Sequence, residues 1–554
     1  SQKMKFQDKQ LLVKNSKPLV PFRNVLVIAL VLFFVAQLVA ALFGVDPAYS
    51  LFSSIERADG VIQYGFWLLY FLMFLSVFRE KRDWTLFFGT FVAVAVLLSG
   101  YSWMNHESQP QLYGIFGNPA YFAAFLLFAI GFSLIAYERR YVQHPLGNYA
   151  LFGTCAFLLV TLVFTQVRGV YVGLAGGIFL FCLLAVLFLR KEQKRLAFAS
   201  GICLLVGAIS LIALLAAKDT EFVQNTRLLY RITEVTNFWE SGSVRERVLN
   251  WNIALKAFAE RPLFGYGPEN FGSAANKYYD YRIGASEPWF DRAHNQPLDT
   301  LATGGVVVFL AYLFWLLAAG LLIFKIAKKE KLLGFLLAGL FLAYFLQGLF
   351  LFDLLAVYLG LFPFLAFLIY EEQKIKRPAF AEATAGKQTT NYLPTGGLPQ
   401  GDKLQNTAYL VLVPVALLSA FVIYASAVVP YKANAAAIQF YAHSEQGYYK
   451  ESMPFLEKAF SIQSPYTTWE VRKRAGWQFS NVLEYEVKEG IEPEKIQAVQ
   501  DIYDIMVGEL EKFIEARPSD PQMYYVLART YRFGSQKLGR DDLGRAEAVL
   551  RKGF

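Results

Sequence analysis

Eleven apolar runs of roughly 17–24 residues alternate with polar connections along this 554-residue chain. A helix of about 20 apolar residues spans the hydrocarbon core of a bilayer, roughly 30 Å. The composition, with 55% hydrophobic residues and 51 Phe, excludes a soluble globular domain of this size. We therefore predict an all-α fold, a polytopic membrane helical bundle with about eleven transmembrane helices. The runs fall near residues 22–43, 61–78, 85–101, 119–137, 149–165, 169–189, 197–217, 301–324, 332–350, 354–370 and 407–428.

Basic residues mark one side of the predicted membrane domain. Alternate connections, together with the N-terminal tail, hold 24 Lys and Arg, whereas the short connections on the other side hold only Arg57 and Arg168. The positive-inside rule places the basic side in the cytoplasm. The first run is longer than a signal-peptide core and has no nearby cleavage site, so we expect it to be retained. We predict a multi-pass protein of the cytoplasmic (inner) membrane, with a cytoplasmic N-terminus and an extracytoplasmic C-terminus.

The net charge of +9 follows from this topology and needs no nucleic-acid partner, because the basic residues gather in the cytoplasmic connections. The three cysteines, Cys155, Cys182 and Cys203, all lie inside apolar runs and lack zinc-ligand spacing. We interpret them as small buried hydrophobic residues.

Three regions, 218–300, 371–406 and 429–554, interrupt the regular alternation of spans and short connections. The long polar loop 218–300 lies on the outer side, and loops of this length usually have a function. The predicted domains are a cytoplasmic tail (1–21), a transmembrane catalytic domain (22–370), a flexible cytoplasmic linker (371–406), a last span (407–428) and an extracytoplasmic helical domain (429–554).

The C-terminal domain has a repeat-like pattern. Small Ala residues and large aromatic residues one turn away occur in 433–461 and again in 523–554, as in stacked helix pairs. The pattern resembles tetratricopeptide repeats, although 462–520 fits poorly and an ordinary small helical domain is the alternative. The chain ends within the second unit without a capping helix. We therefore expect either a truncated chain or a domain that packs on another surface.

Two arginines on the outer side are candidates for phosphate binding. Arg168 lies in Phe-Thr-Gln-Val-Arg-Gly, at the outer end of a span, where it can form a forked contact with phosphate oxygens. An interfacial anchor is the alternative role for Arg168. Arg247 lies in Arg-Val-Leu-Asn-Trp, and a second arginine is needed to meet the charge of a diphosphate.

The segment around Arg247 predicts an amphipathic helix against the membrane or the bundle. Its predicted apolar face consists of Val248, Trp251, Leu255 and Phe258, with Arg245 also in the first turn. Pro262 ends this helix, and the sequence around Tyr266, Gly-Tyr-Gly-Pro, predicts a tight turn. For Gly265 and Gly267 in this turn, a structural role is favoured over phosphate binding.

The motif Asp-Arg-Ala-His-Asn at 291–295 closes the long loop and contains one of only four histidines. His294 can act as a general base near neutral pH if a neighbour, such as Asp291, fixes its tautomer. The alternative is a helix N-terminal box in which Asn295 or Asp299 caps the next span.

Two weaker motifs lie in other outer loops. Arg57 follows the first span in Ile-Glu-Arg-Ala-Asp-Gly, and structural and functional roles are about equally favoured for it. Asn118 lies in Gly-Asn-Pro-Ala-Tyr, where capping of the fourth span is favoured.

These motifs together resemble the O-antigen ligase and polymerase superfamily. The shared features are Thr-x-x-Arg-Gly, Gly-Asn-Pro, a long outer loop with Arg-x-x-x-Trp and Pro-x-x-Gly-x-Gly-x-x-x-Phe, and a closing Arg-Ala-His-Asn. The resemblance covers roughly residues 20–370. It rests on the order of the motifs and on their common outer side.

The resemblance implies a membrane glycosyltransferase of the GT-C type that uses no metal or cofactor. The implied donor is an undecaprenyl-diphosphate-linked glycan, and the acceptor is a glycan, lipid or protein hydroxyl at the outer face of the bilayer. The resemblance gives Arg168 and Arg247 to the diphosphate and His294 to the acceptor hydroxyl, with Asp291 as the expected orienting group. Substrate-binding roles are expected for Arg292, Arg245, Arg57, Asn118, Tyr266 and Asn295.

Two departures affect the expected acceptor. Ligases of this family commonly have twelve spans, and the outer tail is not part of their core. The tail suggests an acceptor or a protein partner of its own, which favours polymerisation or protein O-glycosylation, as by a protein O-oligosaccharyltransferase, over lipopolysaccharide ligation. A polyprenyl-glycan transporter is an alternative, but most span centres carry no charge. A scaffold with a degenerate transferase core is a further alternative, which the intact motifs disfavour.

Overall fold

The computed structural model describes residues 21–376 and 424–553 with short gaps at 55–56, 58, 107–110, 142–143, 227–228, 231–232, 234–241, 281, 284–289, 466 and 488–491. The predicted N-terminal tail, the cytoplasmic linker and the eleventh span lie almost entirely outside these described residues. Among the described residues all regular structure is helical, which confirms the predicted all-α class.

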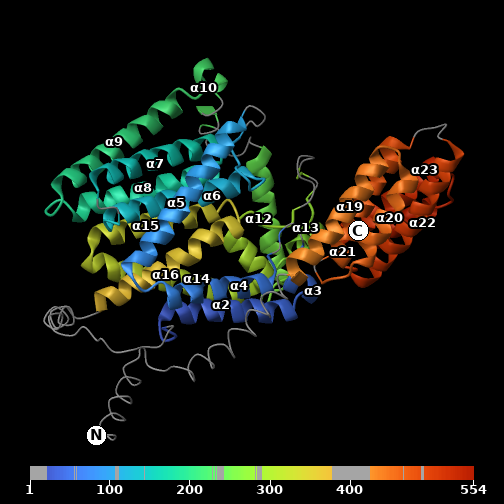
Figure 1. Ribbon diagram of the computed structural model, residues 1–554, viewed down its shortest axis with the longest axis horizontal. Helices are drawn as coiled ribbons and strands as arrows, with labels where there is room; N and C mark the ends of the chain where they lie inside the picture. The colour runs from blue at the N-terminus through green and yellow to red at the C-terminus, as the bar shows by residue number, and fades with distance from the viewer. Residues whose placement is uncertain are drawn as a thin grey trace, which may run out of the picture. The chain divides into compact units, whose positions relative to one another are not determined.

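Nine described helices are long and apolar enough to cross a membrane, and the shorter α4 is also apolar. Their bounds agree with the first ten predicted spans to within six residues, and Figure 1 shows how the helices are arranged. These helices are α2 (Val25–Leu42), α4 (Val61–Val77), α5 (Lys81–Met104), α6 (Pro119–Glu138), α7 (Pro145–Phe164), α8 (Arg168–Phe188), α9 (Lys194–Ala216), α14 (Gln296–Lys329), α15 (Lys331–Gly348) and α16 (Leu355–Lys376). Between them lie α3 (Pro47–Phe52), α10 (Glu221–Asn225), α12 (Gly242–Glu260) and α13 (Phe271–Lys277). The chain is therefore a multi-pass membrane protein.

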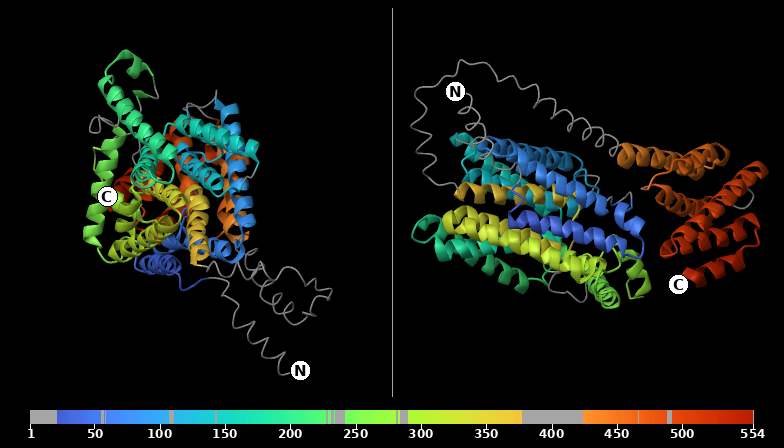
Figure 2. Two further views of the ribbon diagram at one scale, coloured as in Figure 1. Left: turned by 90° about the vertical axis from the view of Figure 1, so that its left-hand side faces the viewer. Right: turned by 90° about the horizontal axis from the view of Figure 1, so that it is seen from below.

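The chain divides into two compact units. The first unit contains most of the membrane helices and comprises Ser1–Ala40, Tyr64–Gly265 and Asp280–Ala381. The second comprises Ala41–Gln63, Tyr266–Tyr279 and Glu382–Phe554, so two loop segments between the spans belong with the C-terminal helices. In the first unit the long helices lie side by side (Figure 2), with α6 and α16 the most deeply buried of the spans.

A stripe of glycines packs α8 directly against α15. A Cβ atom on Gly173 would lie 2.5 Å from the carbonyl oxygen of Ala343, and one on Gly177 would lie 2.5 Å from that of Gly339. Gly169, one turn earlier, lies similarly close to the side chain of Phe350. Small residues at every fourth position let two membrane helices approach closely. This contact fixes the Arg168 end of α8 against the loop that follows α15.

We expect Gly173→Ala to destabilise the bundle by about 1–3 kcal/mol, because the new methyl group overpacks against a helix backbone. Thermal unfolding in detergent measures the effect. The matched control is Gly153→Ala in α7, where a Cβ meets no atom within 4 Å and helix propensity improves. Equal melting temperatures for the two variants would contradict this packing.

Ion pairs tie several helices together at the basic end of the bundle. Arg139, which follows α6, pairs with Glu330 and, at 2.6 Å, with the fully buried Glu371 of α16. Lys325 of α14 contacts Glu372 at 3.3 Å. Paired charges are tolerated in a buried position, whereas removal of one partner is strongly destabilising.

A kink in α14 brings α12 over the start of that helix. Gly305 adopts φ 63° inside α14, and the segment after α12 crosses there, with the amide of Val306 donating to the carbonyl oxygen of Pro262 at 2.8 Å. A Cβ on Gly265 would lie 2.5 Å from the backbone of Thr303. The predicted turn after Pro262 is therefore confirmed, with φ 65° at Gly265.

The face of α12 that packs on the protein includes Ile253, Ala254 and Ala257, which are buried. Leu255, on the predicted apolar face, is half exposed on the protein surface. The prediction placed that face against the membrane or the bundle, and the contact with the bundle is made with α14.

In the second unit, the C-terminal helices share one apolar core. They are α19 (Val429–Glu445), α20 (Tyr449–Ser461), α21 (Thr468–Asn481), α22 (Pro493–Ala516), α23 (Pro521–Leu538) and α24 (Leu543–Gly553). The turn between α22 and α23 meets the loop segments of the same unit. Arg517 pairs with Asp46 at 3.4 Å and lies over the ring of Tyr49, while the Ser273 hydroxyl donates to the carbonyl oxygen of Ser519.

The cysteines lie within membrane helices, as predicted from their apolar surroundings. Cys182 is buried, Cys155 is half-buried and Cys203 is exposed on the protein surface, so burial holds only in part. Among the described residues no three His, Cys, Asp or Glu side chains converge into a metal-binding group.

Candidate functional site

The segment 291–295 forms a tight turn immediately before α14. His294 adopts the left-handed conformation, with φ 52°. Asn295 caps the helix, since its side-chain oxygen accepts from the amide of Leu298 at 3.0 Å. The predicted helix N-terminal box is therefore present, and it holds His294 at the end of a span opposite the basic connections.

Asp299 fixes the turn from inside the helix. Its carboxylate accepts from the Ala293 amide at 2.8 Å and pairs with the Arg292 guanidinium at 3.3 Å. Arg292 is 5% exposed and also lies over the ring of Phe352, with 5.4 Å between the guanidinium carbon and the ring centroid. The Arg292 side chain therefore makes these contacts, with Asp299 and Phe352, inside the protein.

The helix α12 holds the same turn from the loop side. Asn250 is buried, and its amide donates to the carbonyl oxygen of Arg292 at 2.8 Å. Arg247 lies three residues earlier, so Arg247 and Asn250 share one helix face. Arg245 is exposed and donates to the carbonyl oxygen of Arg282. The structure therefore connects the Arg247 face of α12, but not Arg245, to the His294 turn.

The imidazole of His294 is half-buried between two aromatic rings. The rings of Phe290 and Phe352 meet it edge-on, with centroids at 5.5 Å and 5.3 Å. Its Nδ1 lies 3.2 Å from the carbonyl oxygen of Arg292. A carbonyl only accepts hydrogen bonds, so this contact favours the tautomer that carries hydrogen on Nδ1 and leaves Nε2 as a proton acceptor. The predicted orienting role of Asp291 stays a prediction.

The loop between α15 and α16, residues 349–354, gathers these elements at one end of the bundle. The carbonyl oxygen of Leu349 accepts from the Asn295 side chain at 3.1 Å, and Phe350 touches α8 at Gly169. Phe352 contacts His294, as above, and Tyr121 near the start of α6. No sequence motif marked this loop as part of the site.

Arg168 is the first residue of α8 and is half-buried. The turn before it is fixed by Thr165, which is buried and donates to the carbonyl oxygen of Leu162 at 2.6 Å. Gln166 takes up the change of direction with φ 56°. The Thr-x-x-Arg-Gly motif thus makes a turn that places Arg168 beside the 349–354 loop, because Gly169 meets Phe350.

Asp353 is a buried acid in the same loop. Its carboxylate accepts from the Tyr344 hydroxyl at 2.7 Å, and its amide donates to the Gln296 side chain at 2.8 Å. Burial raises the pKa of Asp353 from its usual 3.8 to about 7.

The raised pKa gives a pH dependence of stability. Between about pH 4 and pH 7 an unfolded Asp353 ionises while the folded one stays protonated, so the free energy of unfolding falls as pH rises through this window. We expect Asp353→Asn to flatten the decline in melting temperature between pH 5 and pH 7. Parallel curves for the variant and the original chain would argue against a protonated Asp353.

We expect Asp299→Ala to destabilise the protein by about 3–5 kcal/mol, because the buried Arg292 guanidinium would lose the carboxylate of Asp299 and the Ala293 amide would lose its acceptor. The melting temperature should fall. Asp219→Ala, at an exposed position, is the control and should match the original chain. Normal stability of Asp299→Ala would contradict the role of this ion pair.

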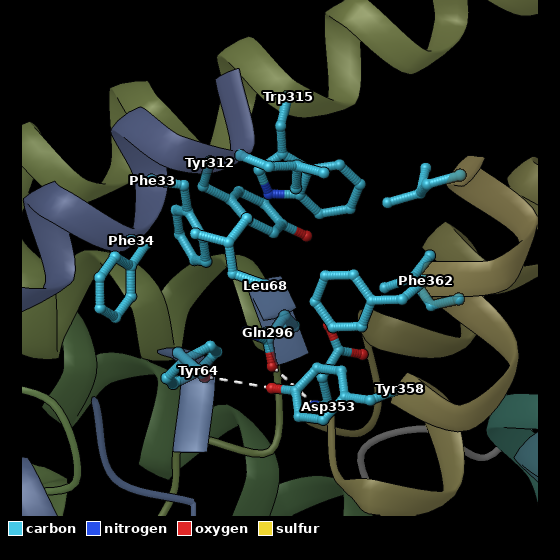
Figure 3. A pocket seen from close by; sticks show the side chains of 13 residues that line it. Phe33, Phe34, Tyr64, Leu68, Gln296, Tyr312, Trp315, Asp353, Tyr358 and Phe362 are labelled. Carbon is cyan, nitrogen blue, oxygen red and sulfur yellow. Dashed lines mark hydrogen bonds between the residues drawn. The ribbon is translucent and has the colours of Figure 1, made fainter. Parts of the chain in front are cut away.

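An aromatic pocket adjoins the site between α2, α4, α14 and α16. Figure 3 shows Tyr312, Trp315 and Phe362 facing this space, while Gln296 and Asp353 supply its polar end. The hydroxyls of Tyr358 and Tyr64 bond across it at 3.1 Å (Figure 3). The pocket lies next to the start of α14, which carries the His294 turn.

The remaining candidate residues serve local structure or lie in the second unit. Asn118 caps α6, since its side chain accepts from Ala120 at 2.8 Å. Tyr266 is buried in the second unit, where its carbonyl oxygen accepts from the Val45 amide. Arg57 belongs to the same unit, with its amide bonded to Ser54.

Residues 153–313 match the family model Wzy_C, described as O-Antigen ligase. The matched segment runs from α7 into α14 and includes Arg168, Arg247 and His294. It ends before the 349–354 loop, and the C-terminal helices lie outside it. No curated protein sequence matches the chain. The match supports a broad function in glycan transfer at a membrane and an enzyme of the glycosyltransferase kind.

Proposed function

We propose that this protein is an inverting, metal-independent membrane glycosyltransferase of the GT-C type. It moves a glycan from undecaprenyl diphosphate to an acceptor hydroxyl at the outer face of the cytoplasmic membrane. The observation that carries the proposal is the convergence of the Arg168 turn and the His294 turn on one loop, 349–354. The O-antigen ligase match over 153–313 supports the same reaction class.

In this proposal His294 is the general base. Its Nε2 accepts the proton of the acceptor hydroxyl while the hydroxyl oxygen attacks the anomeric carbon of the glycan. The bond from that carbon to the diphosphate oxygen breaks, and undecaprenyl diphosphate leaves with the electron pair. The Nδ1 contact to the Arg292 carbonyl supports this role, because it keeps Nε2 available as the acceptor.

Arg168 and Arg247 stabilise the leaving diphosphate. Negative charge grows on the phosphate oxygens as the glycosidic bond breaks, and preorganised guanidinium groups oppose it. Arg168 stands at a fixed turn, and Arg247 shares a face of α12 with Asn250, which binds the His294 turn. Arg292 is paired with Asp299, so we assign it to positioning the turn and not to direct phosphate binding.

The candidate acceptors are a hydroxyl group of a glycan, of a lipid or of a protein. The helical C-terminal domain meets the loop segments 41–63 and 266–279 within its own unit, which supports a role in presenting an acceptor or a protein partner. We favour polymerisation or protein O-glycosylation on this ground.

The test is to delete the gene and identify which extracellular molecule loses its glycan. Restoring the original chain should restore the glycan, and a chain without 429–554 should restore it poorly if the domain presents the acceptor. An unchanged glycan profile after deletion would refute the proposed function.

A further inference from the structure

A second open apolar space lies between α8, α14 and α15, away from the His294 turn. It has a volume of about 550 Å³, within the usual range of about 300–1,000 Å³ for ligand pockets. Phe324, Ala338 and Phe341 contribute to its walls, and Lys328 and Lys331 stand at its end. We call this space the α8–α14–α15 groove.

The groove and the His294 turn occupy opposite ends of the bundle. Lys328 lies in the last turn of α14, 34 residues after His294, and Phe188 of the groove is the last residue of α8, which begins with Arg168. At about 1.5 Å per residue, the two ends of α8 lie roughly 30 Å apart. The groove therefore adjoins the other leaflet of the bilayer and is separate from the proposed transfer site.

Glycine shapes the groove. Gly334 approaches Ala327 so closely that a Cβ would lie 2.3 Å from the Ala327 Cα, which fixes α14 against α15 at their junction. Further along α14, a Cβ on Gly320 would meet no atom within 4 Å. The helices are thus in contact at the basic end, while the space beside Gly320 stays open toward the lipid.

The charges at the end of the groove are basic and accessible. Lys328 is placed over the ring of Phe324, with Nζ 4.5 Å from the centroid. Lys331 pairs with Glu192, and the two side chains are 39% and 54% exposed. Exposed ion pairs typically contribute about 0–1 kcal/mol, so a phosphate can compete with Glu192 for this lysine.

We propose that the α8–α14–α15 groove binds an anionic phospholipid of the bilayer. One acyl chain occupies the apolar groove, and the phosphate contacts Lys328 and Lys331. An apolar channel that ends in two lysines matches a molecule with an apolar chain and an anionic head, and basic pockets between membrane helices commonly bind such lipids. This site is independent of the transfer reaction, and its occupant is not the glycan donor.

The test is native mass spectrometry of the full chain in detergent. The purified protein is titrated with phosphatidylglycerol or with phosphatidylcholine of the same acyl chains. We expect phosphatidylglycerol to bind at least about 10-fold more tightly. The double variant Lys328→Gln/Lys331→Gln should lose this preference, whereas Lys329→Gln, one residue outside the groove lining, should retain it.

A second variant tests the groove itself. Gly320→Leu fills open space in a helix, so it should fold normally and lower the binding of both lipids by at least about 10-fold. Gly153→Leu, where a Cβ also meets no atom within 4 Å, should bind lipid like the original chain. Equal binding of the two lipids by the original chain would overturn the proposal. Undiminished lipid binding by Gly320→Leu would also overturn the proposal. The same holds if the protein forms a dimer that buries the groove.

Discussion

Replacing His294 with asparagine is expected to lower glycan transfer by at least about 100-fold, the usual contribution of a general base. Asparagine tolerates the left-handed backbone, so the turn at φ 52° should persist. Asparagine cannot accept the hydroxyl proton at neutral pH, and the loss should therefore appear in the catalytic rate while the protein stays folded. Transfer is measured as extracellular glycan in cells at equal protein levels.

The matched control is His144→Asn at the opposite end of the bundle. His144 caps α7 by accepting from the Leu146 amide at 3.2 Å, and asparagine is a good residue at an N-cap. We expect full transfer from this variant. Normal transfer by His294→Asn would remove His294 as the base and leave it with a structural role at the start of α14.

Replacing Arg168 with lysine is expected to lower transfer by about 100-fold or more. Lysine keeps the positive charge but lacks the planar fork that binds two phosphate oxygens at once. A lost donor to a developing negative charge typically reduces the catalytic rate by about 100–1,000-fold. The measurement is transfer per molecule of folded protein, since the first turn of α8 should not change.

The control for Arg168→Lys is Arg195→Lys, in the first turn of α9 at the basic end. This arginine is exposed, and its replacement should leave transfer intact. Full activity of Arg168→Lys would mean that Arg168 is only an interfacial anchor. Binding of lipid diphosphate is measured for the folded fraction of each variant. This measurement separates a loss of affinity from a loss of folded protein.

The membrane helices were predictable because length and hydropathy determine them almost alone. The ten spans that lie within the described residues agree with the predicted runs to within six residues. A bilayer requires each crossing segment to satisfy its own backbone hydrogen bonds, so the helix is the only local solution here. The glycine stripe of α8, formed by Gly169, Gly173 and Gly177, was not predicted, because its close contacts are with α15 and the loop after it, which lie far along the chain.

The arrangement of the site was predictable only in part. The motif of His294 and the helix of Arg247 were found because their residue types are rare or periodic. The positioning role of Asp299 and the loop 349–354 were missed, because their contacts join segments far apart in the chain. The prediction left open whether the apolar face of α12 meets lipid or protein, since helical period alone does not distinguish the two, and the structure buries Ile253, Ala254 and Ala257 instead of Leu255.

The most direct test of the account is transfer by the purified protein in proteoliposomes. The liposomes contain a glycan linked to undecaprenyl diphosphate and an acceptor with a free hydroxyl. We predict that each transferred glycan is accompanied by one released undecaprenyl diphosphate, and that His294→Asn and Arg168→Lys suppress both products together. Movement of the intact lipid-linked glycan across the bilayer, with no diphosphate released, would contradict the account and indicate a transporter.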